Sequence, residues 1–223
     1  MNLIEYPDRD MLMIDLANRL AGELSEALLH HERATFAVPG GTTPGPIFDT
    51  LSGTDLHWDR IDVLLTDERW VPEESPRSNT ALVRERLLTN RAAMAEFIPI
   101  YQETETPEQA LDALSAGVQD RLPISVLLLG MGADGHIASL FPGADKLDEA
   151  LDDHAPPLMA MRAPGAPEPR ITLTAPVLSG AISTHILITG PEKRETLERA
   201  HHARQDEMPV RVIWSDVTVH WAA

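Results

Sequence analysis

The chain has 223 residues, a formal net charge of −17 and no cysteine. This length suits one large domain with a buried core, and we expect residues 1–223 to form a single domain. The 35 acidic residues against 18 basic ones repel polyanions, which argues against nucleic acid as a partner. The lack of cysteine excludes disulfide bonds and thiolate chemistry.

The start of the sequence, MNLIEYPDRD, carries acids where a signal peptide has basic and then apolar residues. Apolar runs such as 124–132 are far shorter than the roughly 20 residues of a membrane helix. We therefore expect a cytoplasmic protein that has no membrane partner. The oligomeric state stays open between a monomer and a weak homodimer.

In the first half of the chain, apolar strands alternate with helices. Leucine at every fourth position predicts an amphipathic helix over 10–31. A buried strand over 34–38 then leads through a glycine-rich turn into a second helix. The apolar run 61–65 predicts another strand, and a helix is expected over about 79–89.

The second half continues the same pattern. Thr106 begins a capping box that predicts a helix ending near Arg121. Five prolines within 155–169 predict a surface loop that could form part of a lid. The remaining expected elements are strands at 124–129, 170–174 and 185–189, a helix over 191–203 and a last strand at 210–214.

This alternation predicts the α/β class: a three-layer α/β/α sandwich with a mostly parallel, Rossmann-like sheet. In such sheets ligands bind beyond the carboxyl ends of the strands. The clusters of Gly, Asp, Arg, His and Lys follow the predicted strands, so a binding site is expected at that edge.

The loop Pro39-Gly40-Gly41-Thr42-Thr43-Pro44 lies between a strand and a helix. Its N–H groups and hydroxyls can surround an anion at the positive end of the helix, which makes Gly40, Gly41 and Thr42 candidates for phosphate binding. The alternative is a tight turn whose glycines only permit positive φ. The loop lacks the lysine of a Walker motif.

Two further clusters carry charge. Lys193, in Gly190-Pro191-Glu192-Lys193, opposes the helix dipole unless it meets an anion. Asp67-Glu68-Arg69 offers a carboxylate pair and a cation that could orient water or hydroxyls and hold phosphate. An accidental placement of the lysine and an ordinary surface ion pair remain the alternatives.

The segment 130–136, GMGADGH, matches G-x-G-x-x-G but is followed at once by Pro142 and Gly143 rather than by a long helix, which argues against a dinucleotide. His136, two residues after Asp134 at a strand end, suits proton transfer because imidazole titrates near neutral pH. We take His136 as the candidate general base. A capping or packing histidine is the alternative.

Taken together, these segments resemble the 6-phosphogluconolactonase family, within the broader glucosamine-6-phosphate isomerase/lactonase fold group. The resemblance rests on five ordered matches that span most of the chain: PGGTTP at 39–44, TDERWVP at 66–72 with Ser78-Asn79, LLGMGADGHIASLFPG at 128–143, RITLT at 170–174 and GPEK at 190–193. One departure is Pro39, which removes a donor N–H from the glycine loop.

The resemblance implies a hydrolase that converts 6-phosphogluconolactone into 6-phosphogluconate, the second step of the oxidative pentose phosphate pathway, with no metal and no organic cofactor. It implies that His136 activates water and that Asp134 helps to position the site, with Asp67 as a third catalytic candidate. It also implies that Arg69, Arg170 and Lys193 surround the phosphate together with the Gly40-Gly41-Thr42 loop.

Two other functions are the alternatives. A glucosamine-6-phosphate deaminase resembles A-F-N-E-P after the histidine, whereas this chain has Ala138-Ser139-Leu140-Phe141-Pro142, and Phe141 cannot exchange a proton. A sugar-phosphate sensor of the repressor type needs a DNA-binding module, for which this acidic chain has no room. A stand-alone binding protein is separated from an enzyme only by assay.

Overall fold

The structure is a computed structural model that describes residues 1–223. At its centre lies a seven-stranded sheet with the order β1-β10-β9-β6-β2-β3-β5, in which every neighbouring pair runs parallel. The predicted parallel sheet is confirmed. Its strands are β1 (Asn2–Glu5), β2 (Ala34–Val38), β3 (Ile61–Leu65), β5 (Glu96–Ile98), β6 (Val126–Gly130), β9 (Ser183–Thr189) and β10 (Val217–Ala222).

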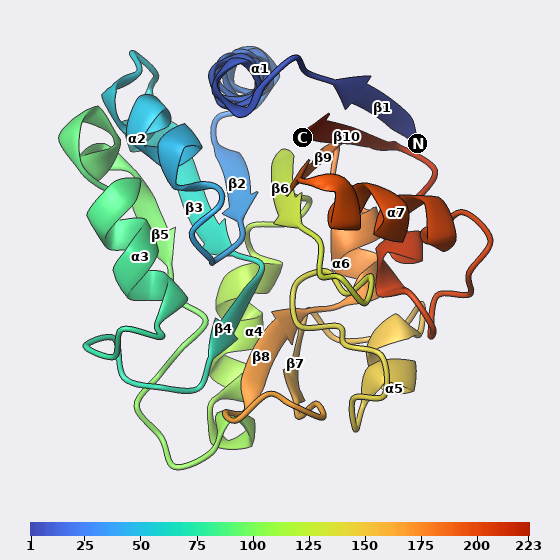
Figure 1. Cartoon of the computed structure of the whole chain (residues 1–223). Helices are drawn as coiled ribbons and strands as arrows, with labels where there is room; N and C mark the ends of the chain where they lie inside the picture. Colours follow the sequence, from blue (N-terminus) through green and yellow to red (C-terminus); the bar gives the residue numbers. More distant parts are fainter.

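Helices cover both faces of this sheet, so the predicted three-layer α/β/α sandwich is confirmed. The chain moves along the sheet from β2 to β3 to β5 and then returns to β6. Because parallel crossovers are right-handed, this reversal moves the later helices to the opposite face. One side holds α1 (Arg9–His30), α2 (Gly45–Gly53) and α3 (Asn79–Arg86), and the other holds α4 (Leu111–Gln119), α6 (Ala175–Ser179) and α7 (Pro191–Ala200) (Figure 1).

Helix α1 follows the predicted leucine pattern. Asp8 precedes the helix, and its carboxylate accepts a hydrogen bond from the Met11 N–H at 2.8 Å, which satisfies one of the free donors of the first turn. Leu12, Leu16, Leu20, Leu24 and Leu28 are all buried. They join a core of 54 buried apolar residues that extends through the sheet. Burial of this face, rather than helix propensity alone, holds α1 against the strands.

A second, antiparallel sheet has the order β4-β8-β7, formed by β4 (Asp67–Arg69), β8 (Arg170–Leu173) and β7 (Leu158–Met161). The prediction of a loop over 155–169 is therefore wrong at 158–161, where β7 forms. Its prolines flank the strand instead of interrupting it, and β7 lies at the edge of the sheet, where proline is tolerated. The lid role of this segment stays a prediction.

The prediction of a last strand at 210–214 is also wrong. These residues belong to a 3-10 helix, η4 (Pro209–Ile213), which begins with a proline that cannot donate to a sheet ladder. The last strand is β10, where Val217 and Val219 are buried, and it pairs with the unpredicted β1. The helix expected over 106–121 is divided into η3 (Pro107–Gln109) and α4.

Three short elements complete the chain: η1 (Trp58–Arg60), η2 (Asn90–Met94) and α5 (Leu147–Leu151). None of the helices is both long enough and apolar enough to cross a membrane.

A buried polar chain joins α1 to the β9–β10 edge of the sheet. The Nδ1 of His185 lies 3.0 Å from the Nε2 of His220 on the neighbouring strand. The chain continues at one end to the Glu23 carboxylate, 2.8 Å from His185 Nε2, and at the other to the Tyr6 hydroxyl, 2.9 Å from His220 Nδ1. Burial, reinforced by the neighbouring His185, lowers the pKa of His220 from 6.5 to about 3.

This depressed pKa predicts a loss of stability in acid. Between pH 6.5 and about pH 3 the unfolded chain binds a proton at His220 that the folded chain does not, so stability is full above pH 6.5 and falls as the pH drops. From pH 7 to pH 5 we expect His220 to cost roughly 2 kcal/mol. Urea unfolding of the His220→Gln variant should show a smaller acid loss than the wild type, whereas His154→Gln, at an exposed position, should lose as much as the wild type. Equal losses in all three proteins would contradict the assignment.

Candidate active site

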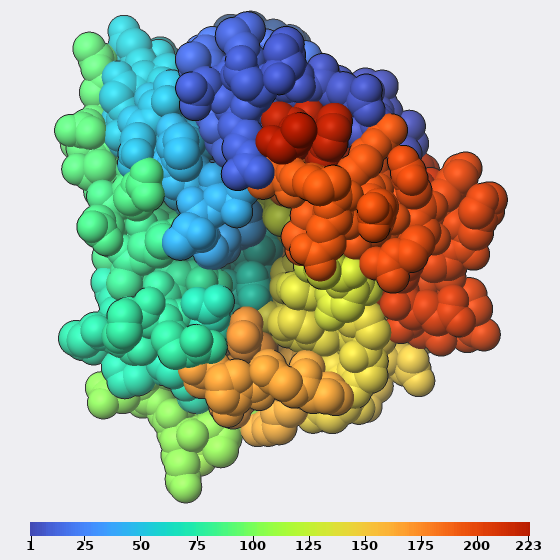
Figure 2. Space-filling view, viewed as in Figure 1, coloured from blue at the N-terminus to red at the C-terminus, as the bar shows by residue number.

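A cavity of about 300 Å³ opens at the carboxyl edge of the parallel sheet. It lies where the order of the strands reverses, between β2 and β6, which is the place that open α/β sheets use for ligands. Figure 2 shows a hollow in this face where blue, teal, yellow and orange stretches of the chain meet. Seven predicted site residues line the cavity: Gly40, Gly41, Asp67, Arg69, His136, Arg170 and Lys193.

Two predicted residues do not line it. Thr42 is exposed at the tip of the glycine loop, and Asp134 contacts His136 from outside the cavity wall. Several residues that line the cavity have no binding or catalytic role in the sequence prediction, among them Asn79, Met131 and Phe141. Asn79 and Phe141 lie within motifs that carry the family resemblance, and the match at Ser78-Asn79 already indicates Asn79.

The glycine loop closes one end of the cavity. A Cβ atom on Gly40 would lie 2.0 Å from the Oδ1 of Asn79, so only glycine fits between the loop and α3. Gly41 has a φ of +84°, which side chains disfavour. The backbone N–H groups of Gly41, Thr42 and Thr43 donate to no other backbone group. They lie just before the N-terminus of α2, so the loop offers free donors to an anion.

Arg69 and Arg170 bring two positive charges directly opposite each other. They are cross-strand partners in the β4–β8 register, an arrangement that is unfavourable for like charges. The Nε atoms of both side chains are buried without a hydrogen-bond partner. Burial lowers the pKa of Arg170, repulsion from Arg69 adds to this effect, and Asp67, with its Oδ2 at 3.8 Å from Arg170 Nη1, opposes it. The pair lacks sufficient negative charge of its own, which favours an anionic ligand.

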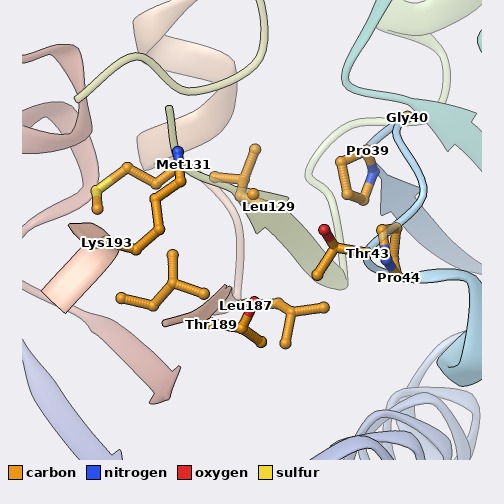
Figure 3. Close-up of a pocket in the computed structure, with 11 residues that line it drawn as sticks. Pro39, Gly40, Thr43, Pro44, Leu129, Met131, Leu187, Thr189 and Lys193 are labelled. Carbon is orange, nitrogen blue, oxygen red and sulfur yellow. The ribbon is translucent and has the colours of Figure 1, made fainter. Parts of the chain in front are cut away.

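Lys193 adds a third cation from the first turn of α7, after Gly190, whose φ is +82°. It forms no ion pair or hydrogen bond within the protein. Figure 3 shows Lys193 beside Met131, with Pro39, Thr43 and Pro44 on the opposite side. These residues line an adjoining cavity of about 180 Å³, so Lys193 faces both spaces.

A tight turn holds the imidazole of His136. The Nδ1 of His136 lies 2.6 Å from the Oδ1 of Asp134, which also accepts the His136 backbone N–H at 3.1 Å. Burial alone would raise the pKa of Asp134, but the charge of His136 and these hydrogen bonds outweigh burial, and the pKa lies below its ordinary value. An ionised Asp134 accepts the Nδ1 proton and leaves Nε2 as the free acceptor, which is the tautomer that a general base requires.

An aromatic ring contacts both the candidate base and one of the cations. The ring of Phe141 lies 4.2 Å from the imidazole of His136, centroid to centroid, and the guanidinium carbon of Arg170 lies 5.6 Å from the Phe141 centroid. The neighbouring Ser139 is buried, and its hydroxyl donates to Asp67 Oδ2 at 2.5 Å. One segment therefore supplies the base, its aromatic neighbour and a donor that holds Asp67.

The expected carboxylate pair at Asp67-Glu68-Arg69 is not formed. Side chains alternate along a strand, so Asp67 and Arg69 line the cavity while Glu68 points to the other side. There Glu68 is fully buried and accepts hydrogen bonds from the start of α3. The cavity thus receives one carboxylate and one cation from β4.

No group of three or more His, Asp or Glu side chains lies in an arrangement that could hold a metal ion. The cavity combines one base, one carboxylate and three cations with a loop of free N–H groups. Such a set can hold a phosphate at one end and deprotonate water at the other.

Residues 7–221 match the model of the family described as "Glucosamine-6-phosphate isomerases/6-phosphogluconolactonase". The chain is 40% identical to a 6-phosphogluconolactonase of Rhizobium meliloti over 230 residues, which cover 100% of this chain and 98% of that protein. It is 43% identical to a 6-phosphogluconolactonase of Pseudomonas aeruginosa over 211 residues, covering 92% and 88%. The crystal structure of a 6-phosphogluconolactonase from Shewanella baltica matches with a TM-score of 0.96 at 31% identity, covering 100% and 98% of the two chains.

The turn that holds His136 depends on a glycine, which gives a testable prediction. A Cβ atom on Gly132 would lie 2.1 Å from His136 Nδ1 and 2.4 Å from Asp134 Oδ1, so Gly132→Ala must displace the imidazole or the carboxylate. We expect a loss of roughly 1–3 kcal/mol in urea unfolding and changed NMR chemical shifts of the His136 ring. Gly130→Ala places its methyl group in open space and serves as the control. If both variants behave alike, the turn does not position the base.

Proposed function

The chain belongs to the family of glucosamine-6-phosphate isomerases and 6-phosphogluconolactonases, and we propose that its function is the hydrolysis of 6-phosphogluconolactone to 6-phosphogluconate, the second step of the oxidative pentose phosphate pathway. One observation carries the proposal: the imidazole of His136 faces the same cavity as Arg69, Arg170 and Lys193. A lactone phosphate needs a base and a cationic pocket at its two ends.

The phosphate group lies among Arg69, Arg170 and Lys193, with the N–H groups of the glycine loop as further donors. The unfavourable contact between the paired arginines is relieved when a dianion binds between them. Because this binding occurs away from the reacting carbonyl, it orients the sugar ring and supplies positional advantage to the reaction. Thr42, exposed outside the cavity, contributes through its backbone rather than its side chain.

Hydrolysis begins when His136 Nε2 accepts a proton from water and the hydroxide oxygen attacks the lactone carbonyl carbon. The carbonyl π electrons move to the oxygen and give a tetrahedral oxyanion. When the carbonyl re-forms, the bond from this carbon to the ring oxygen breaks, and the imidazolium of His136 returns the proton to that oxygen. Asp134 holds the tautomer and stabilises the imidazolium, and Asp67 orients water or a sugar hydroxyl.

A glucosamine-6-phosphate deaminase is the alternative within the same family. Phe141, at the position where the deaminase pattern carries a glutamate, lines the cavity against His136. A phenyl ring supplies no proton for ring opening of an amino sugar. The position therefore favours lactone hydrolysis.

Removal of the base tests the proposed mechanism. His136→Ala should reduce turnover of freshly generated 6-phosphogluconolactone by about a hundredfold or more, because no other neutral base faces the cavity. Calorimetry should still detect binding of 6-phosphogluconate, since the cations remain. His154→Ala, at an exposed position, is the matched control. Near-normal turnover of the His136 variant would remove His136 from the mechanism.

Removal of a cation tests the phosphate site. Lys193→Met keeps the length of the side chain but not its charge, and it should raise KM for the phosphorylated lactone about tenfold with little change in kcat. The preference for phosphorylated over unphosphorylated gluconolactone should fall in parallel. Lys146→Met, the only other lysine in the chain and outside the cavity, controls for the loss of a positive charge. An unchanged KM in the Lys193 variant would refute its contact with phosphate.

A further inference from the structure

Glu68 is a buried carboxylate that has no part in the reaction described above. Its side chain points away from the cavity, and the residue is fully inaccessible to solvent. Burial raises its pKa, and hydrogen bonds from Asn79, Thr80 and Arg69 oppose that rise. A buried charge costs free energy unless hydrogen bonds compensate it, so the partners of this carboxylate matter.

Every partner of this carboxylate is a donor. Oε1 accepts the backbone N–H of Arg69 and the backbone N–H of Asn79, each at 2.8 Å. Oε2 accepts the backbone N–H of Thr80 at 2.7 Å and the Thr80 hydroxyl at 2.8 Å, with the Ser78 hydroxyl farther away at 3.4 Å. An ionised carboxylate is the side-chain group in which two oxygens accept hydrogen bonds and neither donates, so this set of donors suits an ionised glutamate.

A single oxygen therefore bridges the two ends of the loop 70–78. Arg69 begins this loop in β4, and Asn79 ends it as the first residue of α3. The same loop holds the other end of the Arg69 side chain, because Arg69 Nη1 donates to the Arg77 carbonyl oxygen at 2.8 Å. The backbone and the guanidinium of Arg69 are thus both fixed by a loop that Glu68 closes.

Asn79 also contacts the glycine loop. Its side-chain Nδ2 donates to the Asp67 carbonyl oxygen at 3.0 Å, while its Oδ1 lies against Gly40 so closely that no Cβ atom would fit between them. Both Asn79 and Gly40 line the cavity. The contacts of Glu68 therefore reach Arg69, Asp67 and Gly40, and none of them reaches His136.

We propose that Glu68 is a positioning residue for the phosphate end of the substrate: it holds Arg69 and Asn79 in place so that the guanidinium and the glycine loop face the same anion. The proposal rests on the proposed function, and it predicts a separation of effects. Loss of Glu68 weakens the binding of the phosphate group, while the turn that holds His136 remains intact.

The test uses Glu68→Gln, which keeps the shape but places an NH₂ group against N–H donors. We expect KM for 6-phosphogluconolactone to rise about tenfold and kcat to change less than about threefold, with the dissociation constant of 6-phosphogluconate rising in parallel with KM. Ser78→Ala is the matched control, because it removes the N-cap of the same helix, through Ala81, and only the longest contact to Glu68, at 3.4 Å, while the bridge from Glu68 Oε1 to Arg69 and Asn79 remains. Its KM should change less than about twofold.

A general destabilisation of α3 would raise KM equally in the glutamine variant and in the Ser78→Ala control, and this outcome overturns the proposal. So does an unchanged KM in Glu68→Gln, or a fall in kcat without a rise in KM. Should the glutamine variant fail to fold, Glu68→Asp keeps the charge but cannot reach both Arg69 and Asn79, and the same criteria apply. If the wild type has no lactonase rate, the proposed function fails, and calorimetry of 6-phosphogluconate with the same variants still decides the role of Glu68.

Discussion

Parallel pairing of β2 with β6 is the constraint on which the site depends. Phe36 and Ala37 of β2 lie in register with Val126 and Leu127 of β6, so both strands end at the same edge of the sheet. The glycine loop leaves β2 there, and the turn with His136 leaves β6 beside it. Because the chain reverses its direction along the sheet between these strands, their helices diverge to opposite faces and a cavity stays open between the loops.

The sign of the charge in the cavity is opposite to that of the molecule as a whole. The whole chain carries −17, yet the cavity receives Arg69, Arg170 and Lys193 against Asp67 as the one carboxylate of its wall. Holding two guanidinium groups opposite each other costs roughly 0.2–1 kcal/mol, more where they are shielded from water. A protein keeps such an arrangement where a ligand offsets it. The acidic exterior repels large polyanions, while a small phosphate can enter and meet concentrated positive charge.

The parts of this structure that could be predicted from sequence are those that depend on neighbouring residues. Leucine spacing predicts α1, and the apolar runs predict β2, β3 and β6. The Asp134–His136 contact joins two residues that the sequence already places two positions apart at a strand end. The position of the glycine loop between a strand and a helix predicts an anion site, and that role stays a prediction.

What escaped prediction depends on contacts between distant residues. The expected Val210–Trp214 strand failed because its apolar run follows Pro209, and β7 was missed because prolines flank it at an edge. The opposite orientations of Asp67 and Glu68 follow only once β4 is known to be a strand whose partner is β8.

The two ends of the cavity are therefore held by different means. His136 is oriented within a turn of a few residues, through Gly132 and Asp134, so its geometry depends on residues close to it in sequence. The end with Arg69 and Arg170 instead needs the β4–β8 register and the closure of the loop 70–78, which bring together residues that are far apart in sequence. Phe141 contacts both ends, with its ring centroid 4.2 Å from the imidazole centroid and 5.6 Å from the guanidinium carbon of Arg170. Its hydrocarbon ring offers neither a charge nor a hydrogen bond to either group, so Asp67, with Oδ2 at 3.8 Å from Nη1, stays the one ion-pair partner of Arg170.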